Sequence, residues 1–187
     1  DVATTLTGRA RLPADAVELI LFGNAGRTGE PRDFRLDGSR LDGTAFTAVG
    51  LAWGIPATDQ LSLGARIHAN IGHGVLLTRD AGSVLDGEDA TAALRLPTIS
   101  SVGAVPGFGM GLDVGVTWTH DESRTGVAVH NAVSSFGWRD ADLRYREAET
   151  LIEGEGVSSD FEARPLSDAP PTLRALLRRR RPARRIE

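Results

Sequence analysis

Apolar and polar side chains alternate along the run at residues 106–121, which reads PGFGMGLDVGVTWTHD. Glycine, threonine and one aspartate lie between apolar residues at every second position, namely Met110, Leu112, Val114, Val116 and Trp118. A period of two predicts a β-strand with two unlike faces. Glycine at alternate positions weakens a strand and needs a reason, such as the close approach of another backbone or a crowded interior.

The same alternation recurs in further segments and predicts two hairpins. Residues 45–55 and 61–77 each carry a continuous apolar face, and the turn at 56–60, PATDQ, joins them. The turn at 120–123, HDES, leads from the first run into a partner strand at 124–133. Weaker strand patterns occupy 92–96 and 140–149.

Helical character is confined to the start of the chain. Residues 12–23, LPADAVELILFG, combine a proline suited to a first turn, acidic residues near the helix start and a glycine for the cap. We therefore expect three regions. They are an N-terminal segment with this helix at 1–33, antiparallel strands at 34–150, and a loop with an Arg-rich tail, disordered or artefactual, at 151–187.

The predicted strands share one format, with an apolar face and a face of glycine, alanine or polar residues. A membrane-crossing β-strand needs roughly 9–11 residues, and an apolar outside with a small or polar inside is typical of a transmembrane barrel. We predict an all-β fold with one short N-terminal helix, in which an antiparallel meander forms part of a transmembrane β-barrel. The alternative is a soluble sandwich that buries the same apolar face. Aromatic residues near predicted strand ends fit an interfacial girdle or sandwich-edge packing, namely Trp53, Trp118, Trp138 and Tyr145.

Composition narrows the function classes. The 187 residues suit one domain, and the absence of cysteine excludes a disulfide framework, a thiol nucleophile and thiolate metal sites. No apolar run of about 18 residues predicts a transmembrane helix. Seven of the 21 arginines lie in the last fourteen residues, while residues 1–173 hold 14 Arg against 24 Asp and Glu, a net charge of −10. The acidic body argues against nucleic-acid binding.

One charged residue stands on the small-residue face of the first run. Asp113 lies among glycines, and a charge in a narrow interior must be paired. We predict that Asp113 ties strands together through an arginine such as Arg66, and that these two share a barrel lumen with His68, Asn70 and His130. A lumen carboxylate that binds a passing cation is the other reading.

No pattern supports catalysis, a cofactor or a metal. The four histidines have no ligand spacing and no completing carboxylate. The glycine run at 107–111 precedes a strand and does not link a strand to a helix, so it does not predict a phosphate loop. No G-x-S-x-G sequence places a serine nucleophile. We expect a non-enzymatic protein without catalytic, cofactor-binding or metal-binding residues.

Three stretches contain short sequence motifs in addition to the alternation of apolar and polar residues. The motif F-G-N occupies 22–24, L-G-A-R occupies 63–66, and G-x-G-x-D-x-G occupies 109–115, with Asn131 in the partner strand. Over about residues 12–145 the chain resembles an uncharacterised bacterial outer-membrane family related to the TraF-like conjugal-transfer proteins and, more distantly, to FadL-type fatty-acid transporters. The resemblance implies a barrel whose full-length form passes or binds a hydrophobic or small solute.

Two features depart from that family. A FadL-like barrel has more strands than this chain can supply, so the resemblance implies a fragment. After residues 170–173 the pattern requires another alternating strand, yet the chain reads ALLRRRRPARRIE, which is typical of GC-rich DNA read in a wrong frame. We interpret it as a truncated or frame-shifted end.

These observations predict a fragment of a non-enzymatic outer-membrane β-barrel protein. Its expected partners are outer-membrane lipid, a hydrophobic small molecule and, at open strand edges, the remainder of the barrel or other chains, with no nucleic acid and no cofactor. The alternative is a soluble β-rich interaction module in the periplasm or at the cell surface.

Overall fold

The computed structural model describes residues 1–89, 91–153, 156–182 and 184–186. Within these residues, twelve strands form one sheet, and every strand pair is antiparallel. The strands are β1 (Val2–Arg11), β2 (Phe34–Arg35), β3 (Arg40–Pro56), β4 (Leu61–Arg79), β5 (Val84–Asp86), β6 (Thr91–Ser101), β7 (Gly107–His120), β8 (Ser123–Trp138), β9 (Leu143–Glu153), β10 (Gly156–Asp160), β11 (Ala163–Pro165) and β12 (Arg185–Ile186). The helices are α1 (Ala14–Phe22) and α2 (Pro171–Arg178), with short 3-10 turns at Gly23–Ala25, Asp140–Asp142 and Leu166–Asp168.

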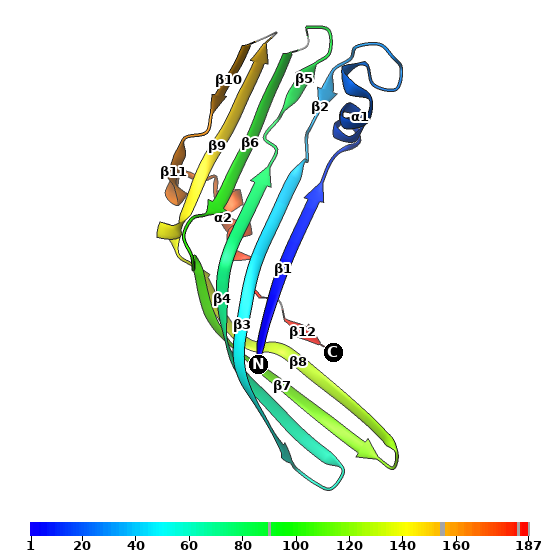
Figure 1. Ribbon diagram of the computed structural model, residues 1–187, viewed down its shortest axis with the longest axis vertical. Coiled ribbons are helices and arrows are strands. Elements are labelled where there is room, and N and C mark those ends of the chain that lie inside the picture. Colours follow the sequence, from blue (N-terminus) through cyan, green and yellow to red (C-terminus); the bar gives the residue numbers. More distant parts are fainter. Residues whose placement is uncertain (90, 154–155, 183, 187) are drawn as a thin grey trace.

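Strand β4 is central to this sheet, because it pairs with β3, β6 and β7. One edge of β4 pairs with β3 along its whole length, and β1 pairs with the far edge of β3. The other edge of β4 pairs with β7 over residues 61–72 and with β6 over residues 76–78, so the sheet forks there. In Figure 1 the β3–β4 and β7–β8 hairpins project at the bottom, while α1, β2 and β5 lie at the top.

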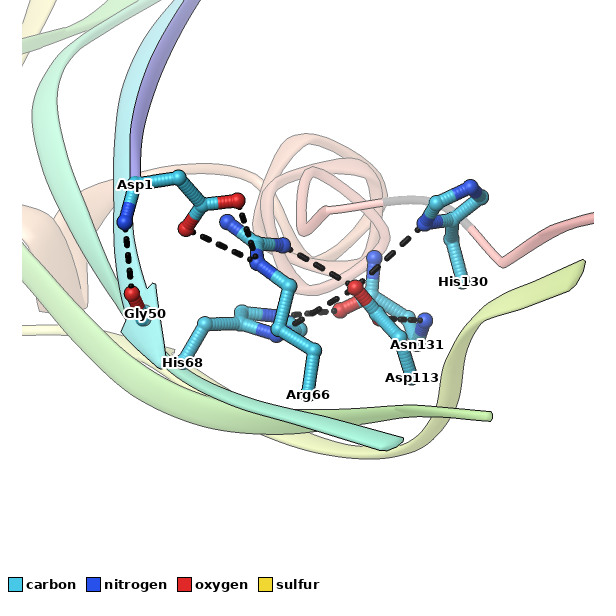
Figure 2. Close-up of polar contacts among 7 residues, drawn as sticks. All are labelled: Asp1, Gly50, Arg66, His68, Asp113, His130 and Asn131. Atoms are coloured by element: carbon cyan, nitrogen blue, oxygen red, sulfur yellow. Dashed lines mark hydrogen bonds and ion pairs between the residues drawn. The ribbon is translucent and has the colours of Figure 1, made fainter. Parts of the chain in front are cut away.

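The register assigns the strand residues to two faces. Ala52, Arg66 and Asp113 are aligned across β3, β4 and β7, as are Leu51, Ile67 and Leu112 on the opposite face. We call the face that carries Arg66 and Asp113 the inner face, and the face that carries Leu51 and Ile67 the outer face. Figure 2 shows the inner-face side chains lying within the curve of the sheet.

Much of the predicted secondary structure is confirmed. The chain is mostly antiparallel sheet, and a short helix occupies Ala14–Phe22. The β3–β4 hairpin and the β7–β8 hairpin have the predicted partners, and Asp121 in the second turn has a φ of +49°. The described strands do not close into a barrel, because β1 and β10 each pair along one edge only.

Two segments differ from the structure that the sequence predicts for them. Val2–Arg11 belongs to the N-terminal segment, for which only the helix at 12–23 is predicted, but it forms β1. All residues of β1 are exposed and therefore carry no burial pattern. Residues 151–187, expected to be a loop and a disordered tail, instead contain the end of β9, three short strands and α2. Apolar contacts account for α2, because Leu173 and Leu177 of this helix are buried in the core.

The hydrophobic core lies where α2 covers the sheet. Buried Leu77 of β4, Ile99 of β6 and Leu143 of β9 pack with Leu173 and Leu177 of α2. Trp138 packs against the edge of this cluster. Figure 1 shows α2 behind the sheet, near β9.

Aromatic rings explain two of the inner-face glycines, Gly72 and Gly107. Phe46, Phe136 and Trp138 form a cluster whose ring centroids are 5.1 to 5.5 Å apart. A Cβ atom added at Gly72 would lie 2.8 Å from the Trp138 ring, and one added at Gly107 would lie 2.6 Å from the Phe136 ring. These glycines therefore leave room for aromatic side chains. Trp138 and buried Tyr145 also lie inside the molecule rather than in an outward girdle.

Gly109→Ala is predicted to destabilise the sheet. A Cβ atom there would overlap the backbone carbonyl of Ser135, which the β7–β8 ladder holds in place. We expect the free energy of unfolding, measured by urea titration, to fall by about 1–3 kcal/mol. Gly64→Ala is the matched control, because a Cβ atom there meets only the Trp53 and Gly115 carbonyls at 3.8 and 4.0 Å. Equal stability of the two variants would contradict the packing role of Gly109.

Ion pairs and a hydrogen bond hold helix α1 in place at the end of the sheet opposite the hairpin turns. The Arg32 guanidinium lies 3.2 Å from Asp15 and 3.0 Å from Glu18. The backbone N–H of Arg35 donates to the Asp15 carboxylate at 3.1 Å. That hydrogen bond, followed by the one from Arg32, lowers the pKa of Asp15 below its ordinary value.

Candidate functional site

A β-bulge positions the one carboxylate of β7. Leu112 pairs with Val133 and Val114 pairs with Val129, so three residues of β8 oppose Asp113 alone. Asn131, in the middle of this bulge, has a φ of +52°, a conformation that asparagine tolerates better than most residues. The Asn131 backbone N–H donates to Asp113 Oδ1 at 2.7 Å, so the carboxylate holds the bulge.

Three cationic or titratable side chains surround the second oxygen of Asp113. Arg66 Nη1 donates to Asp113 Oδ2 at 2.9 Å, and His130 Nδ1 lies 3.3 Å from the same oxygen. His68 Nδ1 lies 3.6 Å away, and His68 Nε2 is 3.2 Å from Asn131 Oδ1. Figure 2 shows these groups converging from β4, β7 and β8. The predicted pairing of Asp113 with Arg66 is therefore present.

Burial makes this pairing energetically important. Asp113 is 6% exposed and His68 is 3% exposed. A buried carboxylate is stable only when cations and hydrogen-bond donors compensate for its lost hydration. Both oxygens of Asp113 accept such hydrogen bonds, one from Arg66 on β4 and one from Asn131 on β8. The Asp113 carboxylate therefore links β7 to both neighbouring strands.

Asp1, the residue before β1, adds a second carboxylate to this network, and no sequence pattern predicts it. The Asp1 carboxylate accepts from Arg66 Nε at 3.1 Å, and the Asp1 and Gly50 backbones are hydrogen-bonded across the β1–β3 ladder. Arg66 therefore bridges the carboxylate of Asp1, which precedes β1, and that of Asp113 on β7, as Figure 2 shows. The contact was missed because no strand was predicted at the start of the chain.

Asn70 shares the inner face but not the Asp113 network. It pairs with Gly109, one inner-face position along β4 from His68, and is 3% exposed. Asn70 Nδ2 is buried and has no hydrogen-bond partner among the residues that the structure describes. Of the five predicted lumen residues, the structure therefore brings Arg66, His68, Asp113 and His130 together and leaves Asn70 apart.

The other histidines lie elsewhere. His73 Nε2 is 2.8 Å from Thr47 Oγ1 at an exposed position, and His120 is beside Asp121 at the hairpin turn. Among the described residues, no group of three or more His, Asp and Glu side chains has an arrangement that could hold a metal ion. The Arg66 guanidinium places a positive charge 2.9 Å from Asp113 Oδ2.

A second buried carboxylate was missed by the sequence reading. Asp42 of β3 is paired with Arg79 at 2.6 Å and with Arg180 at 2.7 Å. The Arg180 carbonyl accepts a hydrogen bond from Trp138 Nε1 at 2.7 Å. These contacts fasten the segment after α2 to the sheet. The sequence contains a run of arginines, but it does not indicate which of them pairs with a carboxylate 138 residues away.

Neither described helix has the length and hydrophobicity needed to cross a membrane. The resemblance to an outer-membrane family stays a prediction. The chain matches no protein-family model, no curated protein and no solved structure.

Proposed function

We propose that this chain is part of a non-enzymatic β-barrel protein of the bacterial outer membrane, with its outer face against lipid and its inner face toward a lumen. The observation that carries the proposal is the exposed apolar surface of the outer face. It comprises Val2, Leu6, Val49, Leu51, Trp53, Ile55, Leu63, Ile67, Phe108, Met110, Val114, Val116, Trp118, Val127 and Val133. Soluble monomers rarely expose so continuous an apolar surface.

The location of the buried core supports the lipid assignment over a soluble sandwich. In a sandwich the most apolar face of the sheet forms the dry interior. Here the described core lies against α2, while Leu51 of the outer face is 79% exposed. The inner face instead buries Asp113 and His68, as expected where a polar interior and an apolar exterior alternate along each strand.

Strand length and aromatic placement agree with this proposal. Strands β3, β4, β7 and β8 have 14 to 19 residues, more than the roughly 9–11 that cross a membrane. Trp53 and Trp118 are outward and exposed near the hairpin ends of β3 and β7. This placement suits an interfacial aromatic girdle.

The open edges of the sheet indicate where further strands would add. Among the strands that the structure describes, β1 pairs only with β3, and β10 pairs only with β9. Exposed backbone donors and acceptors at such edges recruit another strand. We propose that the remainder of a barrel, or other chains, pairs there, and that the complete barrel passes or binds a hydrophobic or small solute.

Flotation tests the membrane assignment. The chain is refolded from urea into phosphatidylcholine vesicles, washed with urea and centrifuged through a density gradient. We expect it to float with the vesicles and to be insoluble without detergent. A chain that stays at the bottom as a soluble monomer would contradict the proposal and favour a soluble interaction module of the periplasm or cell surface.

A further inference from the structure

A cavity of about 820 Å³ lies between α2, the end of β8, the start of β9 and β11. This volume is within the range that small-molecule ligands occupy. Phe136, Trp138 and Leu177 supply apolar surface to the lining. Figure 1 places these elements together on the β9 side of the molecule, away from the hairpin turns.

The charge of the lining is strongly positive. Five arginines line the cavity against one carboxylate, that of Asp140. Two of the five have acidic partners, because Arg164 lies 3.2 Å from Glu147 and Arg180 lies 2.7 Å from Asp42. The other three arginines of the lining are Arg144, Arg174 and Arg178.

These three guanidinium groups have no carboxylate partner among the described residues. Arg144 Nη1 donates only to the backbone carbonyls of Ala141 and Leu143, each at 2.9 Å. The side chains of Arg174 and Arg178 have no hydrogen bond or ion pair with any other described residue. The Nε atoms of Arg174 and Arg180 are also buried and lack an acceptor. A buried guanidinium N–H without an acceptor is costly, and a bound anion would remove that cost.

We propose that this cavity binds the phosphate group of an organic phosphate ester. Guanidinium groups match phosphate oxygens through paired N–H donors, which explains a lining built from arginine. The apolar wall at Phe136 and Trp138 accommodates the organic part of the ester. This inference goes beyond the proposed function and does not require lipid contact at the outer face.

Tryptophan fluorescence provides a direct assay in detergent solution. Replacing Trp53 and Trp118 by phenylalanine leaves Trp138, in the cavity wall, as the sole tryptophan. Phenyl phosphate and dihexanoyl phosphatidic acid are then titrated separately. We expect a saturable change in Trp138 emission with at least one of them. Tighter binding of phosphatidic acid would identify a lipid source of the phosphate, and tighter binding of phenyl phosphate would identify a soluble source.

Arginine variants connect the binding to the cavity. Arg174→Gln and Arg178→Gln are each expected to weaken the affinity at least tenfold. Arg124→Gln, an exposed change at the start of β8, should leave it unchanged. Arg178 is itself exposed, so its variant keeps the fold and remains informative even if Arg174→Gln disrupts α2. No saturable signal with either ester, or equal affinity in Arg178→Gln and Arg124→Gln, would overturn the proposal.

Discussion

Asp113→Ala is expected to lower the free energy of unfolding by about 3–5 kcal/mol, because removing one partner of a buried ion pair leaves the other charge uncompensated. The variant deprives Arg66 of its β7 partner and the Asn131 N–H of its acceptor. It also leaves His68 without a carboxylate beside it. Urea titration of the folded chain in detergent measures the loss.

The control for this prediction is Asp59→Ala, which removes an exposed carboxylate in the β3–β4 turn. We expect a change within about 0.5 kcal/mol there. A double-mutant cycle with Arg66→Met isolates the pair, since removing both charges is less costly than removing one. If Asp113→Ala and Asp59→Ala were equally stable, Asp113 would not be a structural tie.

Val114→Arg is expected to disfavour insertion into vesicles by roughly 2–4 kcal/mol, the cost of a cation on the lipid face near the bilayer midplane. Val114 is an outer-face residue in the middle of β7, with apolar neighbours on both sides. The fraction of chain that refolds into phosphatidylcholine vesicles at increasing urea concentrations measures the effect.

Val102→Arg is a closely matched control. Val102 is 37% exposed and Val114 is 40% exposed, but Val102 lies in the loop after β6. The same substitution at Val102 should leave insertion within about 0.5 kcal/mol of the original chain. Equal insertion of the two variants would show that the outer face of β7 does not meet lipid.

Local patterns predicted the hairpins. The alternation through Leu51 and Val114 assigns each residue to a face, and the short turns fix which strands pair and in which register. Because Asp113 is a charged residue among glycines, the sequence also predicts an arginine partner for it, such as Arg66. The structure adds a reason for two of those glycines, because a Cβ atom would meet His68 and Asn131 at Gly111 and the Phe136 and Trp138 rings at Gly107.

Contacts between distant segments could not be predicted in the same way. No pattern links β4 to β6, which pair over only three residues. The N-terminal strand β1 mixes threonine and arginine with apolar residues, and all its residues are exposed, so its sequence resembles a loop. The pairing of Asp42 with Arg180 depends on the position of α2, which is set by tertiary packing of Leu173 and Leu177.

Quenching by brominated lipid is the most direct measurement of whether the outer face meets lipid. Single-tryptophan variants retaining Trp53, Trp118 or Trp138 are refolded into vesicles with and without dibromo-phosphatidylcholine. We predict strong quenching of the outward Trp53 and Trp118 and little quenching of the inward Trp138. Equal quenching of all three, or none at Trp53 and Trp118, would contradict the lipid-facing assignment.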